Sequence, residues 1–98
     1  MKDDLERYVA ERDGREPGFA ALVEAAEQRR AFARRMAKQR RKRGLSQTQI
    51  AAKMATSPSI VSRLESGSDV RISTLEKYLA ALGMELRMTA RQLSERPE

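Results

Sequence analysis

Basic side chains are concentrated in one segment of this 98-residue chain. Residues 29–43 contain nine Lys or Arg and no Asp or Glu, and the whole chain carries a net charge of +6. Closely spaced cations bind nucleic-acid phosphates by releasing condensed counterions, whatever the base sequence. The first 28 residues have the opposite balance, with eight acidic and four basic side chains. The sequence predicts a phosphate-binding segment and, before it, a segment that suits a basic partner. The alternative for the basic run is a solvated helix face.

The side chains that most hydrolytic enzymes and metal sites use are missing. The chain has no Cys and no His, which excludes disulfides, thiol nucleophiles, zinc fingers and Ser–His–Asp triads. We therefore expect no enzymatic activity, no metal, no cofactor and no small-molecule substrate. No apolar run approaches the ~20 residues of a membrane span, and no signal-peptide core follows the first residues. We expect a cytoplasmic, nucleoid-associated protein with no membrane partner.

Residues 45–67 predict two short helices joined by a tight turn. Ser46 and Gln49 have the spacing of a capping box, in which each side chain bonds the backbone of the other residue. Ser57 and Pro58 begin the second helix as its N-cap and first helical residue, and Gly67 ends it. The apolar residues of the predicted buried face are Ile50, Ala51, Met54, Val61 and Leu64. Two helices this short bury little surface, and their common use is to place the second one in a DNA major groove.

Helical patterns also precede this pair. Asp3 or Asp4 is predicted to cap a short helix, which a cluster of Gly and Pro around residue 17 ends. A second apolar series follows, and the sequence leaves open whether Pro17 to Arg43 forms one helix or two with a bend near Arg29. The apolar positions of these two series that could also meet a partner are Leu5, Tyr8, Val9, Phe19, Leu22 and Val23.

A further helix and a change of period follow Gly67. Ser73 and Glu76 have the spacing of another capping box, and Gly83 is the predicted stop. The predicted buried face comprises Leu75, Tyr78, Leu79 and Leu82. Beyond it the apolar residues Met84, Leu86 and Met88 alternate with polar ones. This period of two predicts a half-buried strand. Because the chain offers no second strand, we expect it to pair antiparallel with the same strand of a second copy; the alternative is a helix or coil.

The paired helices resemble the helix-turn-helix of the lambda repressor/Cro-like family, also called the XRE family. The matching residues are Leu45-Ser46-Gln47, Ile50-Ala51, Met54, Ser57, Val61-Ser62-Arg63-Leu64-Glu65 and Gly67. The resemblance extends over residues 31–83 and implies a buried ion pair between Arg40 and Glu65. With the flanking patterns, it predicts a mainly α fold, a lambda-repressor-like helix-turn-helix bundle. The predicted parts are an N-terminal helical arm (1–28), a DNA-binding domain (29–83), a dimerisation strand (84–90) and a disordered tail (91–98).

Two residues depart from the family pattern. Ala55 replaces the usual Gly of the turn, and since Ala at positive φ costs about 1 kcal/mol, a variant turn is expected. Pro58 stands where Gln is frequent, and proline has no side-chain group to bond a base edge. We therefore expect few base contacts.

The resemblance makes residues 57–66 the recognition helix. Arg63 is expected to bond guanine O6 and N7, and Ile60 to pack on a thymine methyl group. Gln47, at a helix N-terminus, suits a phosphate. Capping is a compatible role for Gln47, and a phosphate contact or solvent exposure is the alternative for Arg63. The predicted DNA-binding residues are Gln47, Ser57, Ser59, Ile60, Ser62, Arg63, Arg41 and Arg43.

A second resemblance lies in the arm. Leu5-Glu6-Arg7-Tyr8 and Glu16-Pro17-Gly18-Phe19-Ala20-Ala21, ahead of such a domain, look like the N-terminal region of HigA-type antitoxins. In that family the region helps hold a RelE/HigB-like mRNA-cleaving toxin. The acidic arm suits a basic partner of this kind. The alternative is that its apolar faces fold back onto the small core.

The sequence thus predicts a dimeric repressor that binds a palindromic double-stranded operator, neutralises a toxin and autoregulates its operon. The first alternative is a stand-alone XRE-family regulator without a toxin. The second is an RNA-binding protein that uses the basic run, which the scarcity of aromatic residues disfavours.

Overall fold

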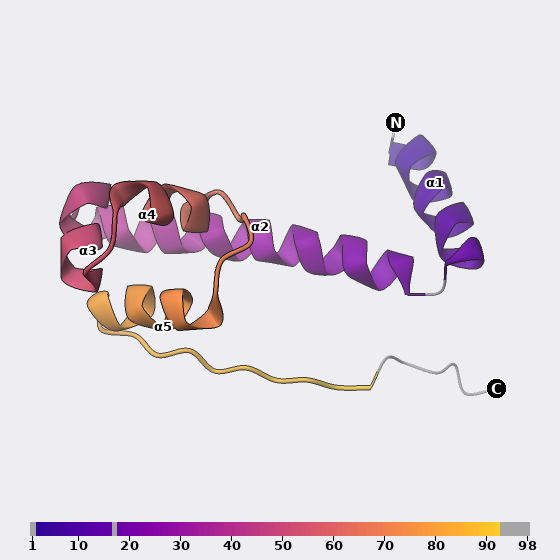
Figure 1. Ribbon diagram of the computed structural model, residues 1–98. Helices are drawn as coiled ribbons and strands as arrows, with labels where there is room; N and C mark the ends of the chain where they lie inside the picture. Colours follow the sequence, from indigo (N-terminus) through magenta and orange to yellow (C-terminus); the bar gives the residue numbers. More distant parts are fainter. Residues whose placement is uncertain (1, 17, 93–98) are drawn as a thin grey trace.

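The computed structural model describes residues 2–16 and 18–92, and this part of the chain contains five helices and no strand. The helices are α1 (Lys2–Arg15), α2 (Phe19–Lys42), α3 (Gln47–Met54), α4 (Pro58–Glu65) and α5 (Ile72–Ala81). Figure 1 shows α3, α4 and α5 gathered around the C-terminal half of α2, with α1 at the opposite end of that helix. None of the described helices is long and apolar enough to cross a membrane.

Helix α2 is a single helix of 24 residues, which answers the question that the sequence left open. It passes without a break through the predicted boundary at residue 28. Its N-cap residue, Gly18, has a φ of 96° and no side chain to cap the helix. The carboxylate of Asp13 in α1 accepts hydrogen bonds from the backbone N–H groups of Gly18 and Ala20 instead. One side chain of α1 therefore bonds backbone N–H groups at the start of α2 and fixes the angle between the two helices.

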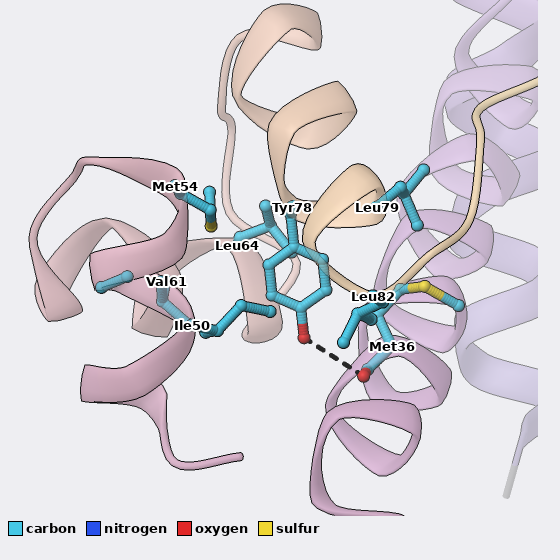
Figure 2. Close-up of a cluster of buried hydrophobic side chains, with 9 residues drawn as sticks. Met36, Ile50, Met54, Val61, Leu64, Tyr78, Leu79 and Leu82 are labelled. Carbon is cyan, nitrogen blue, oxygen red and sulfur yellow. Dashed lines mark hydrogen bonds between the residues drawn. The ribbon is translucent and has the colours of Figure 1, made fainter. Parts of the chain in front are cut away.

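The core lies between the four helices of the bundle (Figure 2). The side chains of Ile50, Val61 and Tyr78 are almost completely buried. The other buried members of the cluster are Met36, Ala51, Met54, Leu64, Leu79 and Leu82. The predicted buried faces of α3 and α4 are confirmed, and Leu75 of α5 is half-buried at the edge of the core. Since side chains from all four helices meet here, the core fixes the orientation of α4.

The turn between α3 and α4 keeps the left-handed conformation although it contains no glycine. Ala55 has φ 57° and ψ 46°, and its N–H and that of Thr56 bond carbonyls of the last turn of α3. The expectation of a variant turn was wrong, because the two hydrogen bonds and the packing of both helices hold Ala55 in place at a cost of about 1 kcal/mol. The capping box of Ser46 and Gln49 is confirmed, with both hydrogen bonds formed.

Two predicted helix starts were wrong. The capping box of Ser73 and Glu76 does not form, because the carbonyl of Arg71 accepts from Thr74 and Leu75 and so begins α5 at Ile72. Asp4 lies within α1, which begins at Lys2, so neither Asp3 nor Asp4 is its cap. In both cases the helix begins before the polar residue that was predicted to cap it.

Residues 84–92 form an extended segment (Figure 1). The N–H of Met84 bonds the carbonyl of Leu79, and Met84 and Leu86 pack on the core while Glu85 and Arg87 are exposed. The predicted alternation of buried apolar and exposed polar side chains is therefore present within a single chain. The strand pairing with a second copy stays a prediction, and residues 93–98 of the predicted tail lie outside the described residues.

A buried ion pair connects α2 to the end of α4, as the family resemblance implied. Nε and Nη2 of Arg40 donate to Oε2 and Oε1 of Glu65 at 2.6 and 3.1 Å, and less than a tenth of either side chain is exposed. Arg40 also donates to the carbonyl of Leu45 at 2.7 Å. Gln47 and Tyr78 donate to the two oxygens of Glu65 at 3.0 and 2.6 Å. The carboxylate therefore joins α2, α3, α4 and α5.

This environment determines the protonation of Glu65. Burial raises the pKa of its carboxyl, but the hydrogen bonds from Arg40, Tyr78 and Gln47 favour the charged form, and the net pKa lies below its ordinary value. The hydrogen bond to Glu65 in turn raises the pKa of Arg40. Burial, and after it the contact with the Glu65 carboxylate, raises the pKa of Tyr78 well above its usual value. The group is an ionised pair to which a neutral phenol donates a hydrogen bond.

Replacing the carboxylate tests this network. We expect Glu65→Gln to lower the free energy of unfolding by about 3 kcal/mol at neutral pH, because Arg40 then remains charged and buried without its anion. The pKa of Glu65 is depressed in the folded state, so its stabilisation is present above the pKa of the unfolded chain and is lost as the pH falls through the folded value. The variant should therefore lose less stability on acidification than the wild type, as measured by urea unfolding over a series of pH values. The exposed Glu76→Gln serves as the control, and equal acid profiles for the two variants would contradict the assignment.

Candidate nucleic-acid interface

Helix α4, the predicted recognition helix, has one apolar face and one polar face. Val61 and Leu64 point into the core, and a helical repeat of 3.6 residues therefore turns the serines at positions 59, 62 and 66 outward. These serines and Arg63 are all exposed. The outward surface is a row of hydroxyl groups with one guanidinium beside it. Such side chains bond base edges and phosphates but do not pack on a protein core.

Ser57 occupies the predicted N-cap position and Pro58 the first helical position. The Ser57 hydroxyl does not cap the helix. It lies 3.0 Å from the hydroxyl of Ser59, so the two groups form a hydrogen-bonded pair at the exposed N-terminal end of α4. Because Pro58 has no N–H and the N–H groups of Ile60 and Val61 bond the Ser57 carbonyl, the N–H of Ser59 is the one at the start of α4 that Ser57 leaves without a partner.

Arg63 lies at the side of α4 that faces the loop 68–71. Its Nη2 donates to the backbone carbonyl of Asp69 at 3.1 Å. Ile60, half-buried, lines the same hollow with Arg71 and Thr74. The structure thus places the two predicted base-contacting residues, Ile60 and Arg63, side by side, on the flank of the helix and next to the loop. Arg63 must exchange one exposed hydrogen bond to reach a base.

Gln47 is the first residue of α3, as predicted, but its side chain is already bound. Its Nε2 donates to Glu65, and the residue is half-buried. A phosphate at this point would be bound by the free backbone N–H groups of the first turn of α3. The side chain of Gln47 acts by fixing that turn against the end of α4.

A second hollow lies between α2, the start of α3 and the outer edge of α4. Two arginines, a glutamine, a carboxylate and two hydroxyl groups supply its polar atoms. It is lined by Arg34, Ala37, Arg41, Gln47, Ser62, Glu65 and Ser66. The structure therefore brings together three predicted DNA-binding residues, Arg41, Gln47 and Ser62. Sequence reasoning missed Arg34 and Ser66, although their positions, two turns before Arg41 and one turn after Ser62, could have indicated them.

Arg43 does not join this group. It is exposed at the end of α2, and its guanidinium donates to the side-chain and backbone oxygens of Gln39 at 2.6 and 3.1 Å. Two residues further along a helix, a side chain points about 200° away. Arg41 and Arg43 therefore face different sides of the molecule.

The end of α4 is held at a fixed distance from α2. Gly67 is buried with a φ of 83°, and a Cβ at this position would lie 2.8 Å from Cγ and 3.0 Å from Cα of Arg30. Arg29 Nε donates to the carbonyl of Gly67 at 2.9 Å. Only glycine allows this approach without displacing the backbone of α2. The contact places the polar face of α4 next to the basic side of α2.

The arm forms a helical hairpin with the N-terminal half of α2, away from the core (Figure 1). The alternative that its apolar faces fold onto the core was therefore wrong. The rings of Tyr8 and Phe19 meet edge to face with centroids 6.3 Å apart, and the guanidinium of Arg12 lies 4.6 Å above the Phe19 ring. Of the predicted partner-binding residues, Val9, Phe19 and Val23 are half-buried within the hairpin, whereas Leu5, Tyr8 and Leu22 are exposed.

The chain is similar to known proteins over most of its length. A family model described as helix-turn-helix matches residues 36–88. Antitoxin HigA1 from two strains of Mycobacterium tuberculosis is 36% identical over 89 residues, which are 90% of this chain and 60% of the antitoxin. The chain spans about 60% of the length of these curated relatives. The resemblance to XRE-type antitoxins of the HigA kind, first indicated by residues 45–67 and by the arm, is confirmed.

The matched region contains α3, the left-handed turn and α4, together with all the residues of the buried ion-pair network that holds them. Because the family model covers more than half of the chain, the chain belongs to the helix-turn-helix family.

Proposed function

We propose that this protein is a sequence-specific DNA-binding repressor that acts as the antitoxin of a RelE/HigB-like toxin and regulates its own operon. The observation that carries the DNA-binding part is the exposed polar face of α4, held in place by the buried network of Glu65. An isolated helix of eight residues would not keep one orientation. Here four helices fix it, so the serines and Arg63 can enter a major groove as a preformed surface.

Base recognition is proposed to rest on Arg63, Ile60 and the small side chains near the N-terminal end of α4. Arg63 can exchange the Asp69 carbonyl for guanine O6 and N7. Ile60 lies beside it and can meet a thymine methyl group. The serines at positions 57, 59 and 62 accept and donate hydrogen bonds without a strong base preference. Phosphate contacts by Arg41, Arg43 and the start of α3 supply the sequence-independent affinity.

We expect Arg63→Ala to weaken binding to the DNA upstream of its own gene by about 1–3 kcal/mol, because one bidentate base contact is lost. Binding to mixed-sequence DNA should fall far less. Arg43→Ala removes the same charge from an exposed site of α2 and should weaken both complexes equally. The two affinities are measured by fluorescence anisotropy at one salt concentration. An Arg63→Ala variant with an unchanged ratio of the two affinities would show that Arg63 reads no base.

Dimerisation through residues 84–88 is proposed to align two α4 helices with a palindromic operator. The segment is extended, its apolar side packs on the core through Met84 and Leu86, and Met88 is 65% exposed. An antiparallel pair of such segments about a two-fold axis satisfies the backbone groups of both and covers Met88. Half-sites about one helical turn apart then match the two recognition helices.

A proline at an exposed position tests the strand. The N–H of Met84 bonds Leu79 within the chain, so the alternation of a strand turns the N–H of the exposed Arg87 to the opposite edge, where a second copy would pair. Arg87→Pro removes that N–H, and we expect a monomer in sedimentation equilibrium at concentrations at which the wild type is a dimer. Arg87→Ala keeps the N–H and should remain dimeric. A dimeric Arg87→Pro variant would exclude pairing through this segment.

The arm is proposed to dock the toxin. The hairpin of α1 and α2 exposes Leu5, Tyr8 and Leu22, three large apolar side chains that the bundle does not use. The glutamates at positions 6 and 27 line the hollow between the two helices. An apolar patch with an acidic edge suits a basic, RNA-binding protein. The similarity to a protein named antitoxin extends over 90% of the chain, and it favours this function over that of a stand-alone regulator.

We expect Leu22→Asp to cost at least about 2 kcal/mol of toxin-binding free energy, because Leu22 is 70% exposed and would be desolvated at the centre of the interface. The measurement is calorimetric titration with a purified RelE/HigB-like toxin. DNA binding by the same variant should be unchanged. Ile72→Asp, at another exposed apolar position, is the control; equal loss of toxin binding in both variants would place the docking surface elsewhere.

A further inference from the structure

The hollow beside α4 contains cations that the core does not use. Arg34 and Arg41 are both exposed, lie two turns apart on α2 and line the same hollow of about 360 Å³. No hydrogen bond or ion pair joins either guanidinium to another side chain in the described part of the chain. Arg40, which directly precedes Arg41 in the sequence, differs from both. It is buried, and its guanidinium is bonded to Glu65 and to the Leu45 carbonyl. Arg40 is therefore a structural arginine, whereas the two arginines that line the hollow have no side-chain partner in the described part of the chain.

We propose that this hollow binds a stretch of the DNA phosphodiester backbone, with Arg34 and Arg41 as its cationic ligands. The inference rests on the proposed DNA-binding function and adds to it a residue, Arg34, and a defined site on α2. The anion neutralises two like charges that share one hollow, and backbone contacts of this kind set the register in which α4 enters the groove.

The other groups at the hollow suit the same ligand. The hydroxyls of Ser62 and Ser66 lie one turn apart on α4 and can donate to phosphate oxygens. The first turn of α3 begins at Gln47 and presents backbone N–H groups that no helical carbonyl uses. Two arginines, two hydroxyls and a helix N-terminus from three different helices thus line one hollow. Each of them is a donor, and none distinguishes one base from another.

The one acidic side chain at the hollow does not oppose an anion. The Glu65 oxygens already accept hydrogen bonds from Arg40, Gln47 and Tyr78, and the Arg40 charge compensates that of the carboxylate. The net charge of the hollow is therefore that of Arg34 and Arg41. Because the same carboxylate fixes α4 and the start of α3, the site is preformed before DNA arrives.

The test compares neighbouring arginines of α2. Arg34→Gln and Arg35→Gln make the same change of charge one residue apart, and the helical repeat turns Arg35 about 100° away, where its guanidinium lies 5.5 Å from the centroid of the Phe32 ring. Binding of each variant to a short mixed-sequence DNA duplex is measured as a function of salt concentration. We expect Arg34→Gln to reduce the slope of log K against log salt by about 0.9, the value for one lost phosphate contact, with the slope of Arg35→Gln unchanged. Arg41→Gln should behave as Arg34→Gln does.

A second measurement locates the contact. Duplexes of the DNA upstream of its own gene, each with one phosphate replaced by a neutral methylphosphonate, should include a position that weakens the wild type but not Arg34→Gln. Equal slopes for Arg34→Gln and Arg35→Gln, or no such position, would overturn the site while leaving DNA binding intact. A wild type that binds no DNA duplex would overturn the proposed function as well. Thermal melts check that the variants are folded, which the exposure of Arg34, Arg35 and Arg41 leads us to expect.

Discussion

The arrangement of the bundle depends on the buried carboxylate of Glu65. A charge removed from water is expensive unless every lone pair is used, and here both oxygens accept from residues of three other helices. Helix α4 ends at this residue, and the ion pair sets how that end lies against α2. Two more contacts act on the same end, the close approach of Gly67 to α2 and the hydrogen bond from Arg29. A helix too short to be stable by itself thus obtains a single orientation.

The long helix α2 separates two surfaces of opposite character. Its C-terminal half supplies the bundle with its core residues and with the arginines beside α4. Its N-terminal half, together with α1, carries exposed leucines and an acidic edge. Because no break interrupts α2, a protein docked on the arm and a DNA duplex docked on the bundle occupy different ends of one rigid element. This geometry would allow one chain to hold both of the proposed partners.

Local patterns predicted the parts of the fold that depend on neighbouring residues. The capping box of Ser46 and Gln49, the buried faces of α3 and α4 and the glycine after α4 were all readable, since each depends on spacing within one or two turns. The starts of α1 and α5 were not, because polar residues with capping potential lie inside both helices. The cap of α2 by Asp13 was also missed, since its partner lies across a turn. The partners of Gln47 and Tyr78, and the hollow that joins Arg34 to Ser66, depend on residues brought together only by the folded bundle. The pair of Arg40 and Glu65 was expected from the family resemblance and not from the spacing of the two residues.

The central claim is that the polar face of α4 and the start of α3 form the DNA-binding surface and that the arm does not. The most direct measurement is an amide chemical-shift titration of the full chain with the DNA duplex from upstream of its own gene. The account predicts that the largest changes fall at Thr48, Ser59, Ser62 and Ser66, with the amides of α1 unaffected. Changes concentrated in α1, with α4 silent, would contradict it.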